Sequence, residues 1–378
     1  MVIMDRAIKP FILKDLEKKM VFLAGPRQVG KTFLAKSFSS LWPEYFYINF
    51  DSDAGRSLFL KKQWDRKSPL IVMDEIHKWP KWKTILKGVY DTEGIPPRIL
   101  VTGSARLGIY RRGGDSLAGR YFLHHLYPLT VAELKNEIKP ADALSQLMKY
   151  GGFPEPFLAQ DETYANRWRK LLIDRIIRED IRDLEPISKI QSMFLLVDML
   201  RERVGSTISY SSIARDIQVS PHTIKHWINI LENMYLIFKI TPYTKNIARA
   251  VLKEPKIYFF DTGMVRKDEG ALFENLVALS IKKHLHHLED TLGEENSLHF
   301  IRDKEKREVD FVVAVNRRAK MLIEVKVGEK NLSKHLLYFK NKIQGVEAVQ
   351  IVKNMDRSLT VEGIQIEKAA DWLSNLAV

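Results

Sequence analysis

The chain begins with short, almost continuous apolar runs that are separated by stretches with helical spacing. The runs cover residues 20–24, 45–50, 70–73 and 99–102. A parallel sheet is covered by helices on both faces, so its strands are apolar throughout instead of alternating. The pattern therefore predicts an α/β core with a parallel sheet over residues 1–128.

The pattern changes three times after this core. Residues 129–205 have helical spacing, with Gly151 and Gly152 as the main interruption. Residues 206–262 predict a compact helical module that ends in two short strands. Residues 263–378 return to mixed α/β spacing after a long opening helix. We therefore expect four segments, of which the second is a small helical lid.

The first apolar run ends in a match to the phosphate-binding pattern G-x-x-x-x-G-K-S/T, and a helical pattern follows it. Glycines let backbone N–H groups curl around a phosphate, and the helix start adds a favourable dipole. In this pattern Lys31 reaches the β- and γ-phosphates and the Thr32 hydroxyl holds Mg²⁺. The residues predicted to bind ATP are Gly25, Pro26, Arg27, Gln28, Val29, Gly30, Lys31, Thr32 and Phe33.

Two carboxylates directly follow the third apolar run, and we expect this run to form a strand next to the first one. Asp74 is predicted to orient the water shell of Mg²⁺, as its second protein ligand after Thr32. Glu75 is predicted to polarise the attacking water. This arrangement favours ATP hydrolysis over kinase-type transfer.

The fourth apolar run ends in Thr102-Gly103-Ser104. Ligands collect at the carboxyl ends of parallel strands, so Ser104 or Thr102 is predicted to sense the γ-phosphate; the alternative is a plain turn. Several arginines follow, any of which could serve as an arginine finger for a neighbouring subunit. They are Arg106, Arg111, Arg112 and Arg120, and Arg120 is the predicted arginine finger.

The third segment has the pattern of a helix-turn-helix. Residues 211–217 predict a short helix, and Ser220 and Pro221 suit the N-cap and first position of a second helix. A strand over 234–240 would add the wing of a winged helix. An inward stripe consists of Ile224, Ile228 and Leu231, which leaves His222, Thr223, Lys225, His226 and Asn229 facing out. The module is predicted to contact DNA; the alternative is a packing module or a protein-binding one.

The last segment contains a predicted hairpin with carboxylates on both strands. Asp310 is expected to share a face with Val312 and Ala314, and Glu324 to lie opposite it on the return strand. Together they could hold a second Mg²⁺ or Mn²⁺, with Lys326 activating water and Glu274 as a third acid. The alternative is two exposed strand ends.

The E-x-K spacing carries little weight by itself. It also occurs in Glu17-Lys18-Lys19, Glu133-Leu134-Lys135 and Glu254-Pro255-Lys256. The copy at Glu324 is distinguished by its place at the end of an apolar strand.

The composition of the chain limits its possible partners and its location in the cell. The formal net charge of +13 favours polyanionic partners such as DNA. The absence of cysteine excludes disulfides and cysteine-based metal sites, and agrees with a reducing compartment. No apolar run is long enough to span a bilayer, and charges at Asp5, Arg6 and Lys9 do not suit a signal peptide. We therefore expect a cytoplasmic protein without a membrane segment.

On the basis of these residues, the chain resembles a prokaryotic family of AAA-type ATPases that carry a C-terminal domain of unknown function. The phrases that carry the resemblance are GPRQVGKT, IVMDEIHKWP, VTGSARL, DSLAGRY, LYPLTVAEL, YGGFPEP, FFDTGM and LFENLV. The tail is similar to PD-(D/E)xK nucleases, which implies roles for Glu274, Asp310, Glu324 and Lys326, although Val309 replaces the usual proline. The resemblance implies an AAA core with a lid, a winged helix, a restriction-endonuclease-like tail and assembly into a homo-oligomer or ring.

Two functions follow as hypotheses. The first is a magnesium-dependent ATPase coupled to DNA binding or processing. The second is an ATP-controlled switch that binds a protein partner and carries an inactive nuclease-like tail. A small-molecule kinase is disfavoured, because Asp74 and Glu75 suit water activation and no acceptor pocket is readable.

Overall fold

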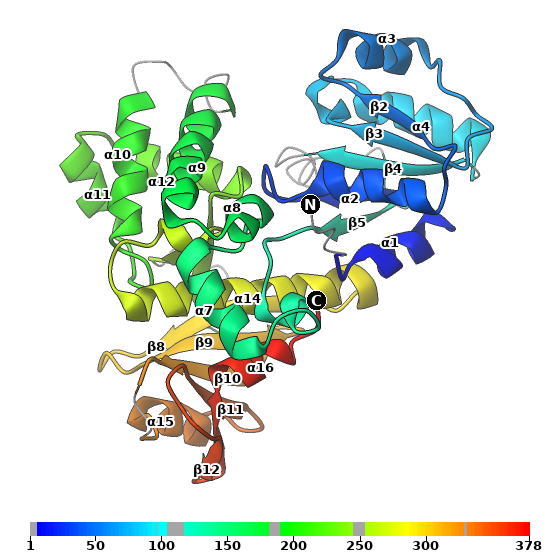
Figure 1. Cartoon of the computed structure of the whole chain (residues 1–378). Helices are drawn as coiled ribbons and strands as arrows, with labels where there is room; N and C mark the ends of the chain where they lie inside the picture. Colours follow the sequence, from blue (N-terminus) through cyan, green and yellow to red (C-terminus); the bar gives the residue numbers. More distant parts are fainter. Residues whose placement is uncertain (1–5, 96, 104–116, 181–189, 245–253, 329–330) are drawn as a thin grey trace. The chain divides into compact units, whose positions relative to one another are not determined.

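The structure is a computed structural model that describes residues 6–95, 97–103, 117–180, 190–244, 254–328 and 331–378 (Figure 1). The chain forms two compact units. The first contains the residues up to Tyr127 together with Asn233–Tyr235, and the second contains Pro128–Glu232 and Leu236–Val378. No helix in these ranges is long and apolar enough to cross a membrane.

The first unit is built on a five-stranded parallel sheet with the order β2-β3-β4-β1-β5. All five strands run in the same direction, so their carboxyl ends meet at one edge. The strands are β1 (Met20–Ala24), β2 (Phe46–Asn49), β3 (Leu70–Asp74), β4 (Arg98–Gly103) and β5 (Tyr121–His125). The predicted parallel sheet is confirmed, and its four apolar runs form the first four strands.

Two features of this sheet differ from the expectation. β3 does not lie next to β1, because β4 pairs with both and separates them. β5 was not predicted, since His124 and His125 interrupt its apolar pattern. His124 is fully buried, and its Nε2 lies 2.8 Å from Asp15 Oδ2, so an ion pair or hydrogen bond replaces the missing apolar contact.

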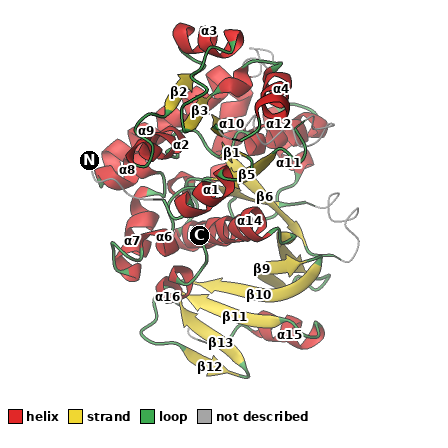
Figure 2. Ribbon diagram, turned by 90° about the vertical axis from the view of Figure 1, so that its right-hand side faces the viewer, coloured by secondary structure: helices red, strands yellow, loops and turns green. Residues whose placement is uncertain are grey.

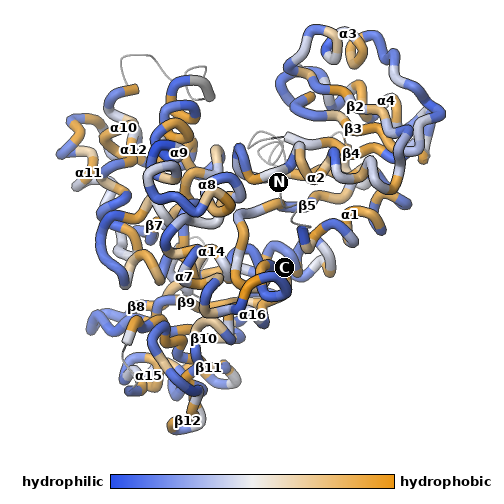
Figure 3. The backbone as a smooth tube through the Cα atoms, in the orientation of Figure 1, coloured by the Kyte–Doolittle hydropathy of each residue, from blue (hydrophilic) through white to orange (hydrophobic). Residues whose placement is uncertain are grey.

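Helices cover both faces of the parallel sheet, and the apolar stripes of the tube in Figure 3 follow its strands. Every residue of β1 and β3 is buried. One face packs Phe22, Met73 and Val101 against Trp82 and Leu86 of the longest helix of this unit. The helices are α1 (Lys9–Leu16), α2 (Lys31–Ser37), η1 (Phe38–Ser40), α3 (Asp53–Lys61), η2 (Ile76–Lys78) and α4 (Trp82–Glu93).

The second unit begins with a group of helices. These are α6 (Val131–Leu134), α7 (Pro140–Tyr150), α8 (Pro154–Ala159), α9 (Glu162–Arg175), the π-helix η4 (Ile176–Asp180), α10 (Ile190–Arg201), α11 (Tyr210–Ile217) and α12 (Pro221–Asn233). The turn from α11 to α12 passes through Gln218 in the left-handed region, at φ 60°. Ser220 caps α12 by accepting a hydrogen bond from the Thr223 N–H at 3.1 Å.

The remaining strands form one eight-stranded sheet with the order β12-β13-β11-β10-β9-β8-β6-β7 (Figure 2). The strands that follow α12 thus join the sheet of the tail, because β6 pairs with β8. The elements are β6 (Ile237–Pro242), β7 (Lys256–Phe259), η6 (Thr262–Met264), α14 (Glu269–Leu292), β8 (Asn296–Arg302), β9 (Glu308–Val315), β10 (Arg318–Lys326), α15 (Lys334–Lys342), β11 (Glu347–Val352), β12 (Leu359–Val361), β13 (Ile364–Lys368) and α16 (Ala369–Ser374).

A buried ion pair joins the helices of this unit to the end of β7. Arg169 Nε lies 2.8 Å from Asp261 Oδ2, and the two side chains are only 6% and 2% exposed. Two glycines make room for it. A Cβ on Gly151 would lie 2.1 Å from Asp261 Oδ1, and one on Gly263 would lie 2.0 Å from Arg169 Nη2. The phrases YGGFPEP and FFDTGM therefore meet around one structural contact.

We expect Asp261→Ala to lower the free energy of unfolding by about 3–5 kcal/mol, because it leaves the buried Arg169 charge without its partner. Chemical denaturation of wild type and variant measures this difference. The matched control is Glu162→Ala, which removes the partner of Lys149 from a pair whose side chains are 60% and 51% exposed. It should leave the denaturation midpoint almost unchanged. Equal effects of the two substitutions would contradict the importance of the buried pair.

Candidate functional site

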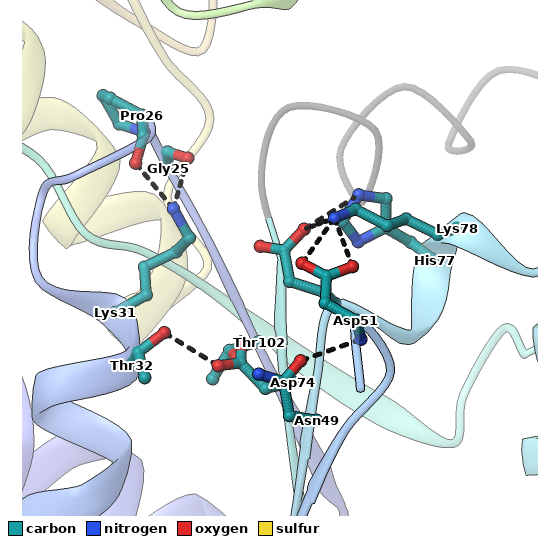
Figure 4. A network of polar contacts seen from close by, with 11 residues as sticks. Gly25, Pro26, Lys31, Thr32, Asn49, Asp51, Asp74, His77, Lys78 and Thr102 are labelled. Atoms are coloured by element: carbon teal, nitrogen blue, oxygen red, sulfur yellow. Dashed lines mark hydrogen bonds and ion pairs between the residues drawn. The ribbon is translucent and has the colours of Figure 1, made fainter. Parts of the chain in front are cut away.

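The side chain of Lys31 folds back onto the loop that precedes α2 (Figure 4). Its Nζ donates to the carbonyl oxygens of Gly25 at 2.9 Å and Pro26 at 2.6 Å. Lys31 is 6% exposed. Burial lowers its pKa to about 8, although the carboxylates of Glu75 and Asp74 act in the opposite direction. The loop thus holds the ammonium group of Lys31 against its own backbone carbonyls.

Two glycines of the loop are required by its geometry. Gly25 has φ 155°, and a Cβ there would lie 2.1 Å from the carbonyl oxygen of Leu126, which extends the pairing of β5 with β1. Gly30 has φ 99°, in the left-handed region that favours glycine, and immediately precedes α2. The backbone can therefore turn sharply between β1 and α2, as a phosphate-binding loop requires.

Three hydroxyl groups converge on the carboxylate of Asp74, at the end of β3. Thr32 Oγ1 donates to Asp74 Oδ2 at 2.8 Å, and Tyr47 Oη donates to the same oxygen at 2.7 Å. Thr102 Oγ1 donates to Asp74 Oδ1. Asp74 is 3% exposed, so these donors replace the water that a carboxylate would otherwise bind. Burial, and after it the bond to Asp74, raises the pKa of Tyr47.

These contacts bring the predicted Mg²⁺ ligands together. A threonine hydroxyl and a carboxylate fit Mg²⁺, which takes one or two protein oxygens and keeps waters or phosphate oxygens as its other ligands. Thr102 donates to Asp74 and so orients this carboxylate, and its predicted role as a γ-phosphate sensor stays a prediction. Ser104, the other predicted sensor, lies outside the described residues.

Glu75 is held in a strained conformation beside Asp74. Its φ of 60° lies in the left-handed region, and its N–H donates to the Thr102 carbonyl oxygen at 3.0 Å. Burial is the main cause that raises the pKa of Glu75, and the charges of Lys31 and Lys78 oppose this effect. A carboxylate with a raised pKa is suited to accept a proton near neutral pH.

Two basic side chains lie near the Glu75 carboxylate. Lys78 Nζ is 3.6 Å and His77 Nε2 is 3.7 Å from Glu75 Oε2. Lys78 Nζ also lies 2.5 Å from Asp51 Oδ1, at the end of β2 (Figure 4). Asp51 and Glu75 therefore share one ammonium group, and neither this network nor Tyr47 was predicted from the sequence.

Two arginines act on the phosphate-binding loop, one by hydrogen bonds to its backbone and one by its charge. Arg6 is buried, and it donates from Nη1 to the Val29 carbonyl at 2.9 Å and from Nη2 to the Tyr127 carbonyl at 2.5 Å. The charge of Arg27, within the loop, opposes protonation of Lys31 and favours the ionised form of Glu75. Arg6 therefore fixes the loop backbone, while Arg27 adds positive charge where phosphates would lie.

Arg120 does not belong to this group of residues. It precedes β5, at the amino-terminal edge of the sheet, where Met20 N–H bonds to its carbonyl. Its guanidinium forms two bonds with Asp91, at 2.6 and 3.1 Å. Since the loop lies at the opposite edge, Arg120 cannot serve its own nucleotide site. Its predicted role as a finger toward a neighbour stays a prediction, and Arg106, Arg111 and Arg112 lie outside the described ranges.

In the second unit, three of the tail's acids gather around a lysine. Lys256 Nζ lies 2.7 Å from Glu308 Oε1, 3.4 Å from Glu274 Oε1 and 3.9 Å from Asp310 Oδ1. Lys256 is only 1% exposed. Burial lowers the pKa of Lys256, and these carboxylates raise it by more, so it remains charged. Lys256 belongs to Glu254-Pro255-Lys256, one of the E-x-K matches to which the sequence analysis assigned no function.

Glu324 has different neighbours from Glu274. Its Oε1 accepts from Ser333 at 3.2 Å and lies 3.1 Å from Lys326 Nζ, whereas its Oε2 is buried without a hydrogen bond. Burial, and after it the charge of Asp310, raises the pKa of both Glu274 and Glu324. Among the residues whose placement is known, no group of three or more acidic or histidine side chains is arranged to hold a metal ion.

The predicted hairpin is present, with one irregularity at Asp310. β9 pairs antiparallel with β10, and the Val325 N–H donates to Asp310 Oδ2 at 2.9 Å. The pairing of β9 with β8 shifts between Val309 and Val312, and both valines pack in one cluster with α15. A bulge of this kind re-aims a side chain. The expectation that Asp310 shares a face with Val312 is therefore wrong.

On α12, the predicted division of faces is confirmed. Ile224, Ile228 and Leu231 are buried, and Lys225 is exposed. His222 and His226 are exposed as well, while Thr223 and Asn229 are partly exposed. Asn229 Oδ1 accepts from Lys239 Nζ of β6 at 2.6 Å, so one of these polar side chains is fixed against the neighbouring strand.

Three family models match successive parts of the chain. Residues 17–135 match the model of an AAA domain. Residues 141–271 match a domain of unknown function (DUF8612), and residues 269–368 match another domain of unknown function (DUF4143). The AAA match, the loop geometry and the Asp74–Glu75 pair together support a P-loop ATPase with a nucleotide site in the first unit.

Relatives and solved structures cover most of the chain. The uncharacterized protein Rv2008c of Mycobacterium tuberculosis is 28% identical, over 79% of this chain and 68% of its own length. The uncharacterized protein MJ1544 of Methanocaldococcus jannaschii is 24% identical, over 89% and 81%. The Walker-type ATPase PABY2304 of Pyrococcus abyssi has a TM-score of 0.42 at 16% identity, over 73% of this chain and 96% of that structure. RuvB of Thermotoga maritima has a TM-score of 0.34 at 18% identity, over 65% and 94%.

We expect nucleotide affinity to be constant below about pH 8 and to fall above it. Phosphates favour protonated Lys31. The pKa of this group is about 8, so binding at higher pH must first add a proton. Each pH unit above this value should weaken binding by up to about tenfold. Equilibrium titration with ADP between about pH 7 and pH 9.5 measures this dependence.

The matched control is Lys31→Arg, whose guanidinium stays charged throughout this range. It should remove most of the pH dependence, whatever its affinity at neutral pH. The same fall in affinity for both proteins would show that another group titrates.

Proposed function

We propose that the chain is a magnesium-dependent ATPase that converts ATP to ADP and phosphate, and that the second unit couples this reaction to DNA. The observation that carries the proposal is the convergence of Lys31, Thr32, Asp74 and Glu75 at one edge of the parallel sheet. Thr32 and Asp74 are separated by 42 positions in the sequence, yet they are joined by a 2.8 Å hydrogen bond.

Each of these residues has a role in the proposed reaction. Lys31 exchanges its bonds to the loop carbonyls for bonds to the β- and γ-phosphates, and the backbone N–H groups before α2 bind the β-phosphate. The oxygen of a water attacks the γ-phosphorus, the bond to the ADP oxygen breaks, and Glu75 accepts the proton of that water. Thr102 and Tyr47 keep Asp74 in place.

Thr32 and Asp74 are the residues that would hold Mg²⁺. When bound, the ion supplies positive charge that neutralises the phosphate oxygens as the γ-phosphoryl group leaves. Tyr47 donates to the same Asp74 oxygen as Thr32, at 2.7 Å. Release of Thr32 toward Mg²⁺ therefore leaves Asp74 oriented by two other hydroxyl groups.

The coupling to DNA is supported by charge and by the exposed face of α12. The chain has a net charge of +13, and Lys225, His222 and His226 are exposed on α12. We propose that this helix contacts DNA within a winged-helix-like module formed by α11, α12, β6 and β7. Positive charge and exposed polar side chains on a helix are the properties expected of a nucleic-acid surface.

Assembly is part of the proposal as well. Arg120 lies at the sheet edge opposite the loop and is paired with Asp91. A guanidinium in this position can reach only the nucleotide of a neighbouring subunit. We therefore propose a homo-oligomer, in which Arg120 or another arginine of the segment 104–120 completes the site.

We expect Glu75→Gln to bind ATP normally and to reduce its turnover by about 10²–10⁴-fold, because the amide cannot accept the proton of water. Lys31→Ala should abolish turnover through lost binding. Phosphate release, together with equilibrium binding of ATP, separates the two effects.

A matched control for this assay is Glu44→Gln, an exposed glutamate of the same unit. It should behave as wild type in both measurements. Unchanged turnover in Glu75→Gln and Lys31→Ala would exclude the site described here.

A second function is favoured by Lys256. Its ammonium lies among Glu274, Glu308 and Asp310, where it supplies the positive charge that a divalent cation would supply. We propose as the alternative an ATP-controlled switch that binds a protein partner, with a nuclease-like tail that does not cleave. The buried lysine stabilises the acids without a metal.

Incubation of the protein with duplex DNA and Mg²⁺ or Mn²⁺ tests both proposals. We expect a gel shift that weakens as salt rises, because phosphate contacts release counterions. Lys225→Glu should weaken the shift, and Lys304→Glu, at another exposed lysine of the second unit, should weaken it less. We expect no metal-dependent cleavage, because the Lys256 ammonium lies among the acids where a divalent cation would bind.

If cleavage is seen, variants of the tail show whether the tail itself cuts the DNA. Cutting that disappears in Asp310→Ala and Glu324→Ala, and remains in the exposed control Glu362→Ala, would show an active nuclease and contradict the inactive tail. Failure to shift DNA at low salt would contradict the DNA proposal and leave the protein-binding switch.

A further inference from the structure

A polar cavity of about 670 Å³ lies within the second unit, and its lining shares no residue with either site described above. Its walls come from α9, α10 and the segment after β7. Its volume is within the range of pockets that bind small molecules. The charged residues of its lining are Arg169, Lys170, Asp174, Asp198, Arg201 and Arg266.

One guanidinium forms a fixed wall of this cavity. Arg169 is bonded to Asp261 at 2.8 Å, to Asn166 Oδ1 at 3.1 Å and to the Tyr150 carbonyl at 2.6 Å. Its charge is therefore balanced by Asp261, which does not line the cavity. Asp174 is likewise engaged elsewhere, because Arg178 Nε donates to its Oδ1 at 2.6 Å.

The other cations outnumber the carboxylate that remains for them. Arg201 Nη1 is 3.4 Å and Arg266 Nη1 is 3.1 Å from the same oxygen, Asp198 Oδ1. Lys170 adds a third positive charge to the lining. The cavity therefore has an excess of about two positive charges over the carboxylates that face it.

Arg201 is the least exposed of these three cations. Its side chain is 12% exposed. Among the described residues, its only side-chain hydrogen bond besides the one to Asp198 runs from Nε to the Met264 carbonyl, at 2.8 Å. Burial, and after it the charge of Arg266, lowers the pKa of Arg201. A partly buried guanidinium that is close to a like charge and poorly paired is costly unless an anion binds there.

We propose that this cavity binds a phosphate group, with Arg201 and Arg266 as the donors that hold it. A phosphate monoester carries a charge near −1.5 to −2 at neutral pH, and a phosphodiester of a nucleic-acid backbone carries about one negative charge. Both are opposite in sign to the excess, and the oxygens of both fit the fork of N–H groups on a guanidinium. The phosphate belongs either to a small phosphorylated compound or to the backbone of a nucleic acid. The proposal is independent of ATP hydrolysis in the first unit.

Titration of the full chain with inorganic phosphate, in the presence of saturating Mg²⁺ and ADP to fill the P-loop, tests this proposal. Arg201→Gln should weaken phosphate binding by about tenfold or more, since it removes a charge-assisted bond. The control is Arg203→Gln, the same change two positions along the chain, where the guanidinium lies 3.7 Å from Asp216 and does not line the cavity. Chloride at matched ionic strength should bind neither to Arg201→Gln nor to Arg203→Gln.

Folding is controlled with Arg266→Gln, whose side chain is 49% exposed and which should fold like wild type. It should weaken phosphate binding several-fold relative to Arg203→Gln. Equal phosphate affinity in Arg201→Gln, Arg266→Gln and Arg203→Gln would overturn the proposal. A bracing role alone would lower the melting temperature of Arg201→Gln without phosphate and leave phosphate affinity unchanged, which would also overturn it.

A second arm of the experiment identifies the source of the phosphate. A short oligonucleotide replaces inorganic phosphate in the same comparison of Arg201→Gln with Arg203→Gln. Weakening of both ligands by Arg201→Gln assigns the cavity to the backbone of a nucleic acid. Weakening of inorganic phosphate alone assigns it to a small phosphorylated compound.

Discussion

The parallel register of five buried strands is the constraint on which the nucleotide site depends. β4 pairs with both β1 and β3, so that Ala24 lies beside Gly103 and Asp74 beside Thr102. The carboxyl ends of the strands therefore place the loop before α2 and the Asp74 carboxylate at one edge. β1 and β3 are buried along their whole length. A shift in their register would therefore expose apolar side chains and separate Thr32 from Asp74.

The second unit uses charge in a different way. Arg169 and Asp261 are buried as a matched pair that holds α9 against the end of β7. Lys256 lies among the carboxylates of Glu274, Glu308 and Asp310, whereas Arg201 and Arg266 share only Asp198. A matched pair can serve the fold alone. Cations that share one carboxylate are destabilising unless an anion binds them, and for this reason we propose an anionic ligand in that cavity.

The sequence predicted local patterns well and long-range partners poorly. The loop at Gly25, the acids after β3 and the two faces of α12 follow from spacing within a short stretch. The insertion of β4 between β1 and β3 does not, and neither do the contacts of Tyr47 with Asp74 or of Lys256 with Glu308. β5 was missed because two histidines break its pattern, and the bulge at Asp310 cannot be read from alternation. Such features depend on tertiary packing, which overrides local preference.

Equilibrium binding of ATP, measured with and without Mg²⁺, tests the nucleotide site most directly. The account predicts that the chain binds ATP, that Mg²⁺ tightens the binding, and that Asp74→Asn removes this effect of Mg²⁺ while ATP still binds. Absence of ATP binding under both conditions, or an undiminished effect of Mg²⁺ in Asp74→Asn, would contradict it.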